Sequence, residues 1–433
     1  MDKIVSITVT KYILGCLLLL PFLGQAQNVP APPQTEGVVI NNVTLHIGNG
    51  KVVERGAIAF NDGKIVYAGT SAGWNGNEEF KQVDGAGKHV YPALIAPNTQ
   101  LGLIEIGAVR ATRDAAETGT YNPHVRSLIA YDTDSEIIPV VRNKGIGLVQ
   151  VTPQGGRISG TSSIMTTDAW NWEDAAYSID EGIHLSWPRL YSFNWRERSL
   201  SKNKKYGEQT ADLKSFLQDA KAYAAVADPA EPNIKMEAMR GLFDGSKQLY
   251  LHADEVEAME TGILLAEDMG IERIVVVGGR DSWMNADFLK SHKVPVILGE
   301  VQALPARSDY DVDQPFKTPK MLADAGVDFC LSVNGFWQQW YLPYQAGQAV
   351  SYGLDPERAI ASISGDAAKI LGIGDRVGTL EVGKDANLMI GDARFLDIRF
   401  SNAEALYIQG RKVSLMEDKQ TKLYEKYKAK YGH

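Results

Sequence analysis

The chain has few cysteines and no excess of basic residues, and each shortage excludes a class of protein. Only two cysteines occur in 433 residues, so disulfide bonds cannot form the framework of the fold. The formal net charge is −9, whereas a general nucleic-acid-binding protein needs a basic face. Hydrophobic residues make up 44% of the chain, which is enough for a core and excludes disorder as the main state.

Long apolar runs are also scarce, and the run near the N-terminus is typical of an export signal. Lysines precede the apolar residues 12–23, and Gly24-Gln25-Ala26 follows them as a cleavage site would. The run is shorter than the roughly 20 residues that span a bilayer. We therefore expect residues 1–26 to be a signal peptide, the mature protein to be exported (periplasmic or secreted), and no segment to span a membrane. Residues 27–36 are rich in proline and polar side chains, which predicts a linker.

Hydrophobic patterning divides the rest of the chain into a central region and two similar ends. Residues 37–87 contain short apolar segments and a hairpin turn at Asn61-Asp62-Gly63. Residues 88–375 alternate apolar segments with helix-like stretches, which favours βα units and a parallel sheet. That pattern predicts a (β/α)8 TIM barrel, with an open doubly wound sheet as the alternative. Strand patterns return over residues 376–412, so we expect both ends to form one small β-sandwich domain, followed by a charged helix over residues 413–433.

Three segments carry a family resemblance. Residues 90–100 are VYPALIAPNTQ, residues 354–372 contain LDPERA and AAKILG, and residues 377–388 are VGTLEVGKDANL. They resemble the first-strand segment, a helical segment and the closing signature of the amidohydrolase superfamily, in particular its imidazolonepropionase-like members. The resemblance extends over residues 37–412 and implies a metal-dependent-hydrolase fold: a barrel with a composite β-sandwich.

The resemblance also implies a divalent metal, such as zinc, that activates water. Its ligands in the family are two histidines after strand one, one histidine each after strands five and six, and an aspartate after strand eight. The corresponding residues here are Asn98, Gln100, His252, a glycine at 278 or 279, and Asn334. Neutral amides bind Zn²⁺ poorly, and Asn334 has no proton that titrates near neutral pH. We therefore expect a degenerate site in which His252 is the one retained metal ligand.

The active site of such a barrel lies at the C-terminal ends of its strands. The residues expected to be catalytic are His252, Asn334, Glu105 and Glu117. Those expected to bind substrate are Asn98, Gln100, Arg113, His124, Arg157 and Trp337. Structural roles compete with these assignments. The charges near Glu105 and Glu117 would also suit a solvated surface, the Gly155-Gly156-Arg157 segment is either an anion-binding nest or a turn, and Trp337 would also suit a core.

Three functions agree with these residues. The first is hydrolysis of a carbon–nitrogen bond in a cyclic amide or a dipeptide-like substrate, with an altered metal site. The second is a catalytically inactive homologue that binds a ligand or a partner. The third is isomerase or lyase chemistry that uses Glu105, Glu117, His124 and His252. The expected partners are a small molecule and either a second copy of the chain or an amidohydrolase with an intact histidine set.

Overall fold

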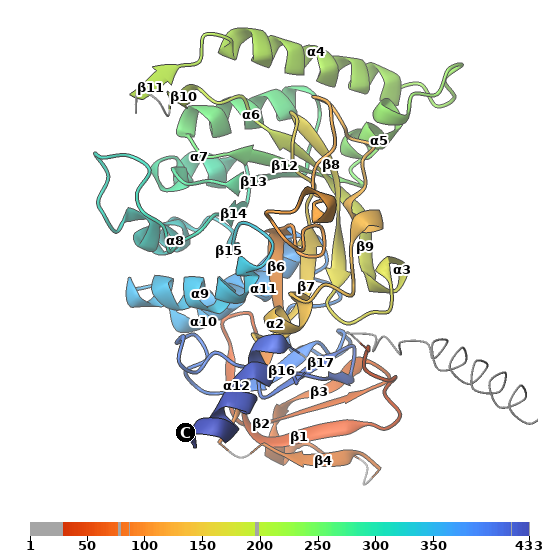
Figure 1. The fold of residues 1–433 in the computed structure, drawn as a ribbon, viewed down its shortest axis with the longest axis vertical. Helices are drawn as coiled ribbons and strands as arrows, with labels where there is room; N and C mark the ends of the chain where they lie inside the picture. Colours follow the sequence, from red (N-terminus) through yellow and green to blue (C-terminus); the bar gives the residue numbers. More distant parts are fainter. Residues whose placement is uncertain (1–28, 77–78, 86, 195–198, 417, 433) are drawn as a thin grey trace, which may run out of the picture.

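The structure, a computed structural model, describes residues 29–76, 79–85, 87–194, 199–416 and 418–432 (Figure 1). The predicted signal peptide, residues 1–26, lies outside the described residues. Among the residues that are described, no helix is both long and apolar enough to cross a membrane.

Strands from both ends of the chain form one sheet. The N-terminal strands are β1 (Val38–His46), β2 (Val52–Asn61), β3 (Lys64–Thr70), β4 (Lys81–Asp84) and β5 (His89–Pro92). The C-terminal strands are β16 (Leu388–Gly391), β17 (Ala405–Ile408) and β18 (Arg411–Val413). The order is β18-β17-β16-β5-β1-β2-β3, with β4 paired to β1. The ring of Phe60 on β2 packs against Tyr407 on β17 with centroids 5.1 Å apart, so strands from the two ends of the chain share a core.

A second sheet of eight strands forms the barrel. Its order is β6 (Leu94–Thr99), β7 (Ile146–Val151), β8 (Ile158–Thr166), β9 (Ala176–Ser186), β12 (Gln248–Ala253), β13 (Ile274–Gly278), β14 (Val296–Leu298) and β15 (Phe329–Leu331). The sheet is nearly closed. The Ile95 N–H of β6 donates to the carbonyl of Ile363, a residue that follows β15, at 3.0 Å. The predicted apolar segments are therefore the strands of a mixed α/β barrel.

The barrel differs from the predicted uniform (β/α)8 pattern at β8, which runs antiparallel to both β7 and β9. Residues 152–157 join β7 to β8, a connection too short for the dozen or more residues that a parallel crossover needs. Gly155 and Gly156 have φ values of 86° and 65°, a left-handed conformation that glycine adopts without strain. These two glycines let the chain reverse directly into β8.

Helices cover the outside of the barrel. The longer ones are α4 (Tyr206–Ala224), α5 (Ile234–Phe243), α6 (Val256–Asp268), α8 (Gln314–Ala325) and α9 (Leu342–Ser351). The shorter ones are α2 (Ile138–Arg142), α3 (Trp172–Ala175), α7 (Ala286–Ser291), α10 (Pro356–Ser362) and α11 (Gly365–Ile370). A small hairpin of β10 (Tyr191–Asn194) and β11 (Ser199–Lys202) precedes α4, and α12 (Lys419–Tyr431) ends the chain beside the lower sheet (Figure 1).

Candidate functional site

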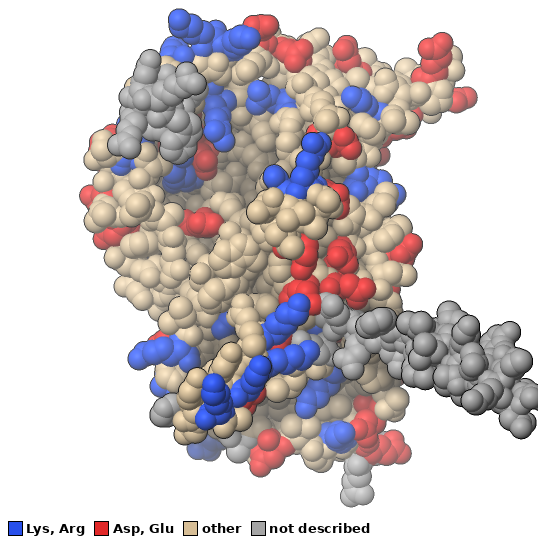
Figure 2. All heavy atoms as spheres, viewed as in Figure 1, with Lys and Arg blue, Asp and Glu red and all other residues tan. Residues whose placement is uncertain are grey.

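The C-terminal ends of the parallel barrel strands define the mouth of the barrel, where chemistry is expected. Because β8 is reversed, its first residue lies at this same end: Ile158 pairs with Leu185 near the end of β9. Figure 2 shows the molecule hollowed beside the long loop that follows β6. The mouth therefore combines the ends of seven strands with the beginning of β8.

Two histidines meet at this end of the barrel. His184 of β9 lies opposite Tyr250 of β12, and Ser186 lies opposite His252. The His184 Nδ1 and His252 Nε2 atoms are 2.8 Å apart. Burial lowers the pKa of His184 well below its ordinary value, and burial lowers the pKa of His252 to about 4. Both rings are therefore neutral at pH 7, and one N–H can be shared between the facing nitrogens.

A buried carboxylate lies below the histidine pair. The Glu181 carboxylate accepts hydrogen bonds from the Ser162 hydroxyl (2.5 Å), the Tyr250 hydroxyl (2.6 Å) and the Gln150 amide (2.8 Å). Burial raises the pKa of Glu181, and these three donors oppose that rise. The Tyr250 ring also stacks on His184, with centroids 4.6 Å apart. The Glu181 carboxylate thus holds the Tyr250 side chain in place, and the Tyr250 ring stacks on His184.

The same network reaches the end of β6. The Asn98 N–H donates to Gln150 Oε1 at 3.0 Å, and Asn98 has a φ of 53°, which is uncommon for a residue with a side chain. Because the amide of Gln150 bonds both Asn98 and Glu181, the buried carboxylate helps to hold the Asn98 backbone in this conformation. Asn98 and Gln100 are themselves buried, 8% and 3% exposed.

The residues at the implied metal-ligand positions do not fit a metal centre. Asn98 and Gln100 supply neutral amides, β13 ends in glycine at 278, and Asn334 is exposed beyond β15. A Cβ added at Gly279 would lie 2.7 Å from the Val296 side chain, so the backbone there is closely packed. No group of three or more His, Cys, Asp or Glu side chains in the described parts of the chain could hold a metal ion. Among the residues that the structure describes, His252 bonds the imidazole of His184 and no carboxylate or thiolate.

Arg157 lies at the mouth beside the histidine pair. Its guanidinium donates to the carbonyl of Ser186 at 2.7 Å, and Ser186 pairs in register with His252. Burial lowers the pKa of Arg157, while the nearby Tyr121 and Asp212 raise it. The glycines before Arg157 form the hairpin turn into β8, and this turn delivers the arginine to the mouth.

The other predicted site residues have different surroundings. The Glu105 carboxylate accepts from the Ser135 hydroxyl (2.5 Å) and the Glu136 N–H (3.2 Å), and so it holds the turn before α2. Glu117 is exposed and accepts from the N–H of its neighbour Thr118 at 2.7 Å. Arg113 is exposed, His124 is half-buried with an unpartnered Nδ1, and Trp337 is 42% exposed. Thus Asn98 and Arg157 lie near His252 in the structure, whereas Glu105 stabilises the turn before α2.

Four residues of this site were not predicted from the sequence: Gln150, Glu181, His184 and Tyr250. His184 and Glu181 lie on β9, a segment with no continuous apolar run. The alternation of Gly182, His184 and Ser186 predicts that these residues share one face of a strand. It does not predict that this face lies next to His252, because that depends on the pairing of β9 with β12.

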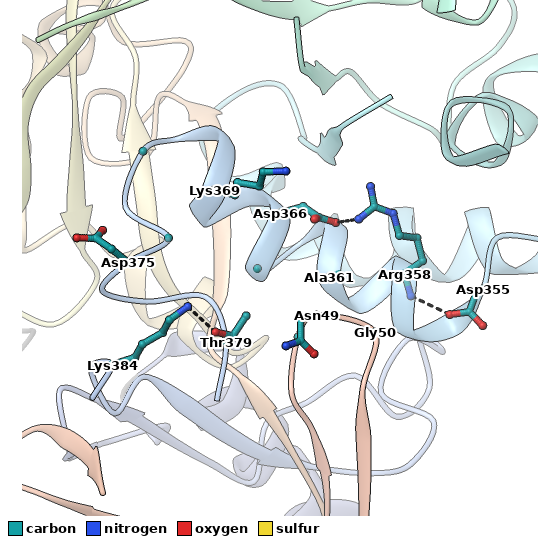
Figure 3. A pocket seen from close by; sticks show the side chains of 14 residues that line it. Asn49, Gly50, Asp355, Arg358, Ala361, Asp366, Lys369, Asp375, Thr379 and Lys384 are labelled. Atoms are coloured by element: carbon teal, nitrogen blue, oxygen red, sulfur yellow. Dashed lines mark hydrogen bonds and ion pairs between the residues drawn. The ribbon is translucent and has the colours of Figure 1, made fainter. Parts of the chain in front are cut away.

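A separate cavity of about 690 Å³ lies between the barrel helices α10 and α11 and the turn that joins β1 to β2 (Figure 3). Two of its charged side chains bond to other residues of its lining. Arg358 bonds Asp366, and the Lys384 ammonium donates to the Thr379 hydroxyl at 2.6 Å. None of the predicted site residues lines this cavity, so it is distinct from the mouth.

Comparisons with known proteins agree with this architecture. The model of the Amidohydrolase family matches residues 218–415. Imidazolonepropionase of Staphylococcus aureus (strain Newman) is 22% identical over 386 residues, which cover 79% of this chain and 84% of that protein. The crystal structure of an amidohydrolase from Thermotoga maritima MSB8 superimposes with a TM-score of 0.75 at 22% identity, covering 87% of this chain and 99% of that chain. A Xaa-Pro dipeptidase with bound methionine has a TM-score of 0.54 at 14% identity, covering 87% and 100% of the two chains.

Proposed function

Because this chain belongs to the amidohydrolase superfamily, we propose that it hydrolyses the carbon–nitrogen bond of a cyclic amide or a dipeptide-like substrate at the barrel mouth. The match to the family supports hydrolysis of a carbon–nitrogen bond as the general activity. The finer substrate class is supported by the names of two relatives, an imidazolonepropionase and a Xaa-Pro dipeptidase. The observation that carries the proposal for this chain is the contact between His184 and His252, 2.8 Å apart at the strand ends.

The proposed chemistry uses His252 as the base. When the His252 Nε2–H donates to His184 Nδ1, the lone pair on His252 Nδ1 is available to water. The water then attacks the carbonyl carbon and gives its proton to Nδ1. The carbon–nitrogen bond breaks as the same proton passes to the leaving nitrogen. His184 orients the base, and Arg157 binds a substrate carboxylate or the oxyanion.

No step is assigned to a divalent metal. His252 is the one family ligand that the chain retains, and the amides of Asn98, Gln100 and Asn334 are poor partners for Zn²⁺. The proposed mechanism therefore relies on the imidazole pair and on Arg157.

A second candidate is a catalytically inactive homologue that binds a ligand or a partner. The buried amides of Asn98 and Gln100 favour it, because an amide both donates and accepts hydrogen bonds but does not activate water. The two candidates predict different effects of substituting His252: a lower rate of hydrolysis in the first, and at most a changed affinity for the ligand or partner in the second.

The test is a hydrolysis assay on the full mature protein with a panel of cyclic amides and dipeptides, before and after dialysis against EDTA. We expect His252→Asn and His184→Asn each to lower kcat by about 100-fold or more. His292→Asn is the control, since the His292 ring bonds Glu267 at 2.8 Å on an outer helix and should leave kcat unchanged.

Three results would contradict the proposed mechanism. Activity that is lost in EDTA and restored by zinc, with about one metal per chain by plasma mass spectrometry, would show a rebuilt metal site. Activity unchanged in both histidine variants would exclude the imidazole pair. Compounds of the panel that bind, as judged by thermal shift, but are never hydrolysed would favour the inactive homologue.

The proposal includes export, which rests on the signal-like pattern of residues 1–26. We expect the protein in the periplasmic or secreted fraction of its cells, with Gln27 at its N-terminus. Recovery of the uncleaved chain in the cytoplasmic fraction would contradict this part.

A further inference from the structure

The C-terminal helix α12 lies on the surface with none of its residues buried. Its apolar and aromatic side chains face water: Leu423 is 50% exposed, Tyr424 63%, Tyr427 47% and Tyr431 60%. A helix without a buried face gains little stability from packing against its own chain. The exposed tyrosines are therefore available to another surface.

The helix is also strongly basic. It contains five lysines, at positions 419, 422, 426, 428 and 430, against one glutamate, Glu425. The complete chain, in contrast, has a net charge of −9. Positive charge is thus concentrated on one short helix of an acidic protein, and the occupant that complements the helix must carry negative charge.

An acidic patch lies beside α12 on the same face. We define it as Asp132, Asp134, Glu136, Glu173 and Asp174. One contact joins its two segments: the Thr133 hydroxyl donates to the Trp170 carbonyl at 3.1 Å. Within the second segment, the Trp170 N–H donates to Asp174 Oδ2 at 3.0 Å. Trp170 is 63% exposed within the patch. Figure 2 shows acidic side chains gathered directly above the basic side chains of α12.

The helix and the patch adjoin within one molecule. Lys419 at the start of α12 pairs with Glu136 of the patch at 2.9 Å. Asn143 bonds Asp418, the residue that caps the helix and accepts from the Thr421 N–H at 2.8 Å. These contacts hold the base of the helix against α2, so the orientation of the helix relative to the patch is defined.

From this juxtaposition we propose that α12 and the acidic patch form a two-fold interface between two copies of this chain. A two-fold axis that lies in the surface between the helix and the patch brings the helix of each copy over the patch of the other. The lysines of one copy then face the carboxylates of its partner, and the exposed tyrosines can pack near Trp170. The surface is self-complementary, which a closed dimer requires.

An anionic membrane fits this face less well. A bilayer that approached the lysines of α12 would also meet the carboxylates of the adjoining patch, which it would repel. A second copy places its acidic patch opposite the lysines of α12 and its own lysines opposite the carboxylates of the patch. Charge complementarity therefore favours the homodimer over a lipid surface.

The dimensions predict a weak and salt-sensitive dimer. A helix of this length extends about 20 Å, and a contact about 10 Å wide along it covers about 200 Å². The helix and the patch together then bury about 400 Å² per subunit, or about 800 Å² in total, which is below the roughly 1,000 Å² of a stable interface and therefore implies a transient dimer. Sedimentation velocity should show dimers at about 20 mM NaCl that dissociate at about 500 mM NaCl, because salt screens exposed charges.

Charge reversal provides the decisive experiment. The helix-reversed variant is Lys422→Glu, Lys426→Glu, Lys430→Glu, and the patch-reversed variant is Asp134→Lys, Glu173→Lys. Each should be monomeric alone at low salt, because each then presents like charges to its copy. An equimolar mixture of the two should form a heterodimer, since the acidic helix of one meets the basic patch of the other and the reverse contact is restored as well. This recovery also shows that both variants fold.

The matched control is Lys204→Glu, Lys205→Glu, Lys214→Glu, which reverses three exposed lysines at α4, at the far end of the molecule (Figure 1). The control should dimerise like the unaltered protein. A protein that is monomeric at all salt concentrations, or a helix-reversed variant that stays dimeric, would overturn the proposal. So would a monomer that binds phosphatidylglycerol vesicles through α12, which would assign the helix to a lipid surface.

Discussion

At the scale of single residues, the buried imidazoles of His184 and His252 make stability depend on pH. Burial lowers the pKa of His252 from 6.5 to about 4 and lowers that of His184 in the same direction. Below pH 6.5 the His252 imidazole is therefore protonated in the unfolded chain, whereas in the folded chain it stays neutral until about pH 4. Stability is full above the unfolded pKa and is lost as the pH falls through this window.

We predict that the free energy of unfolding falls by about 3 kcal/mol between pH 6.5 and pH 4 through His252 alone. Urea unfolding at a series of pH values would measure it. His252→Asn should flatten the profile over this range. A profile of equal slope in His252→Asn and the unaltered protein would contradict the assignment.

Residues of the site differ in how far the sequence could predict them. Asn98 and Gln100 stand in a segment that resembles a family pattern, and His252 ends an apolar stretch, so the sequence could propose all three for the site. His184 and Glu181 could not, because their place depends on strand register. Asp180, with a φ of 52°, forms an irregularity in β9 beside Glu181, and nothing in the neighbouring residues marks it as a bulge. Glu105, in contrast, was expected in the site but caps a turn.

At the scale of secondary-structure elements, apolar strands were predicted and polar strands were not. The strands that contain Ile146–Val151, Leu249–His252 and Ile274–Val277 are mostly apolar and appear where expected. β8 is different: it includes Ser159, Thr161, Ser162 and Ser163, and yet all nine of its residues are buried. Partners supplied by distant segments, such as Glu181 for Ser162, make this burial possible, and a local pattern cannot reveal them.

One buried ion pair joins several elements around the end of β8. Asp168 accepts from Arg142 of α2 at 3.2 Å and from the Ala31 N–H at 3.2 Å, and it pairs with Arg411 of β18 at 3.3 Å. Arg142 and Asp168 are each 1% exposed. The pair thus connects the N-terminal segment, the barrel and the last strand.

We predict that Asp168→Ala lowers the free energy of unfolding by about 3–5 kcal/mol, because it leaves the Arg142 guanidinium buried without this carboxylate. Thermal unfolding followed by circular dichroism would measure the loss. Asp324→Ala is a suitable comparison, since Asp324 pairs with Lys320 on the surface of α8 and should cost less than about 0.5 kcal/mol. Equal effects of the two substitutions would show that the buried pair does not stabilise the junction.

At the scale of the whole molecule, the two ends of the chain depend on each other. β5 pairs with β1 on one side and with β16 on the other. Along β17, Leu406 and Ile408 belong to the core of the barrel, whereas Ala405 and Tyr407 belong to the core of the lower sheet. The C-terminal strands therefore complete both cores.

Two truncations separate this structural role from the role of the last helix. Removal of residues 376–433 should prevent cooperative folding, because β5 loses its partner β16 and both cores lose the side chains of β17. Removal of residues 419–433, which keeps the buried Asp418, should change the melting temperature by only a few degrees, since no side chain of α12 is buried. The shorter truncation should nevertheless abolish dimers in sedimentation velocity. If the longer truncation still melted cooperatively at the original temperature, the composite core would not be needed for folding; if the shorter one melted much earlier, α12 would be part of the fold rather than an interface.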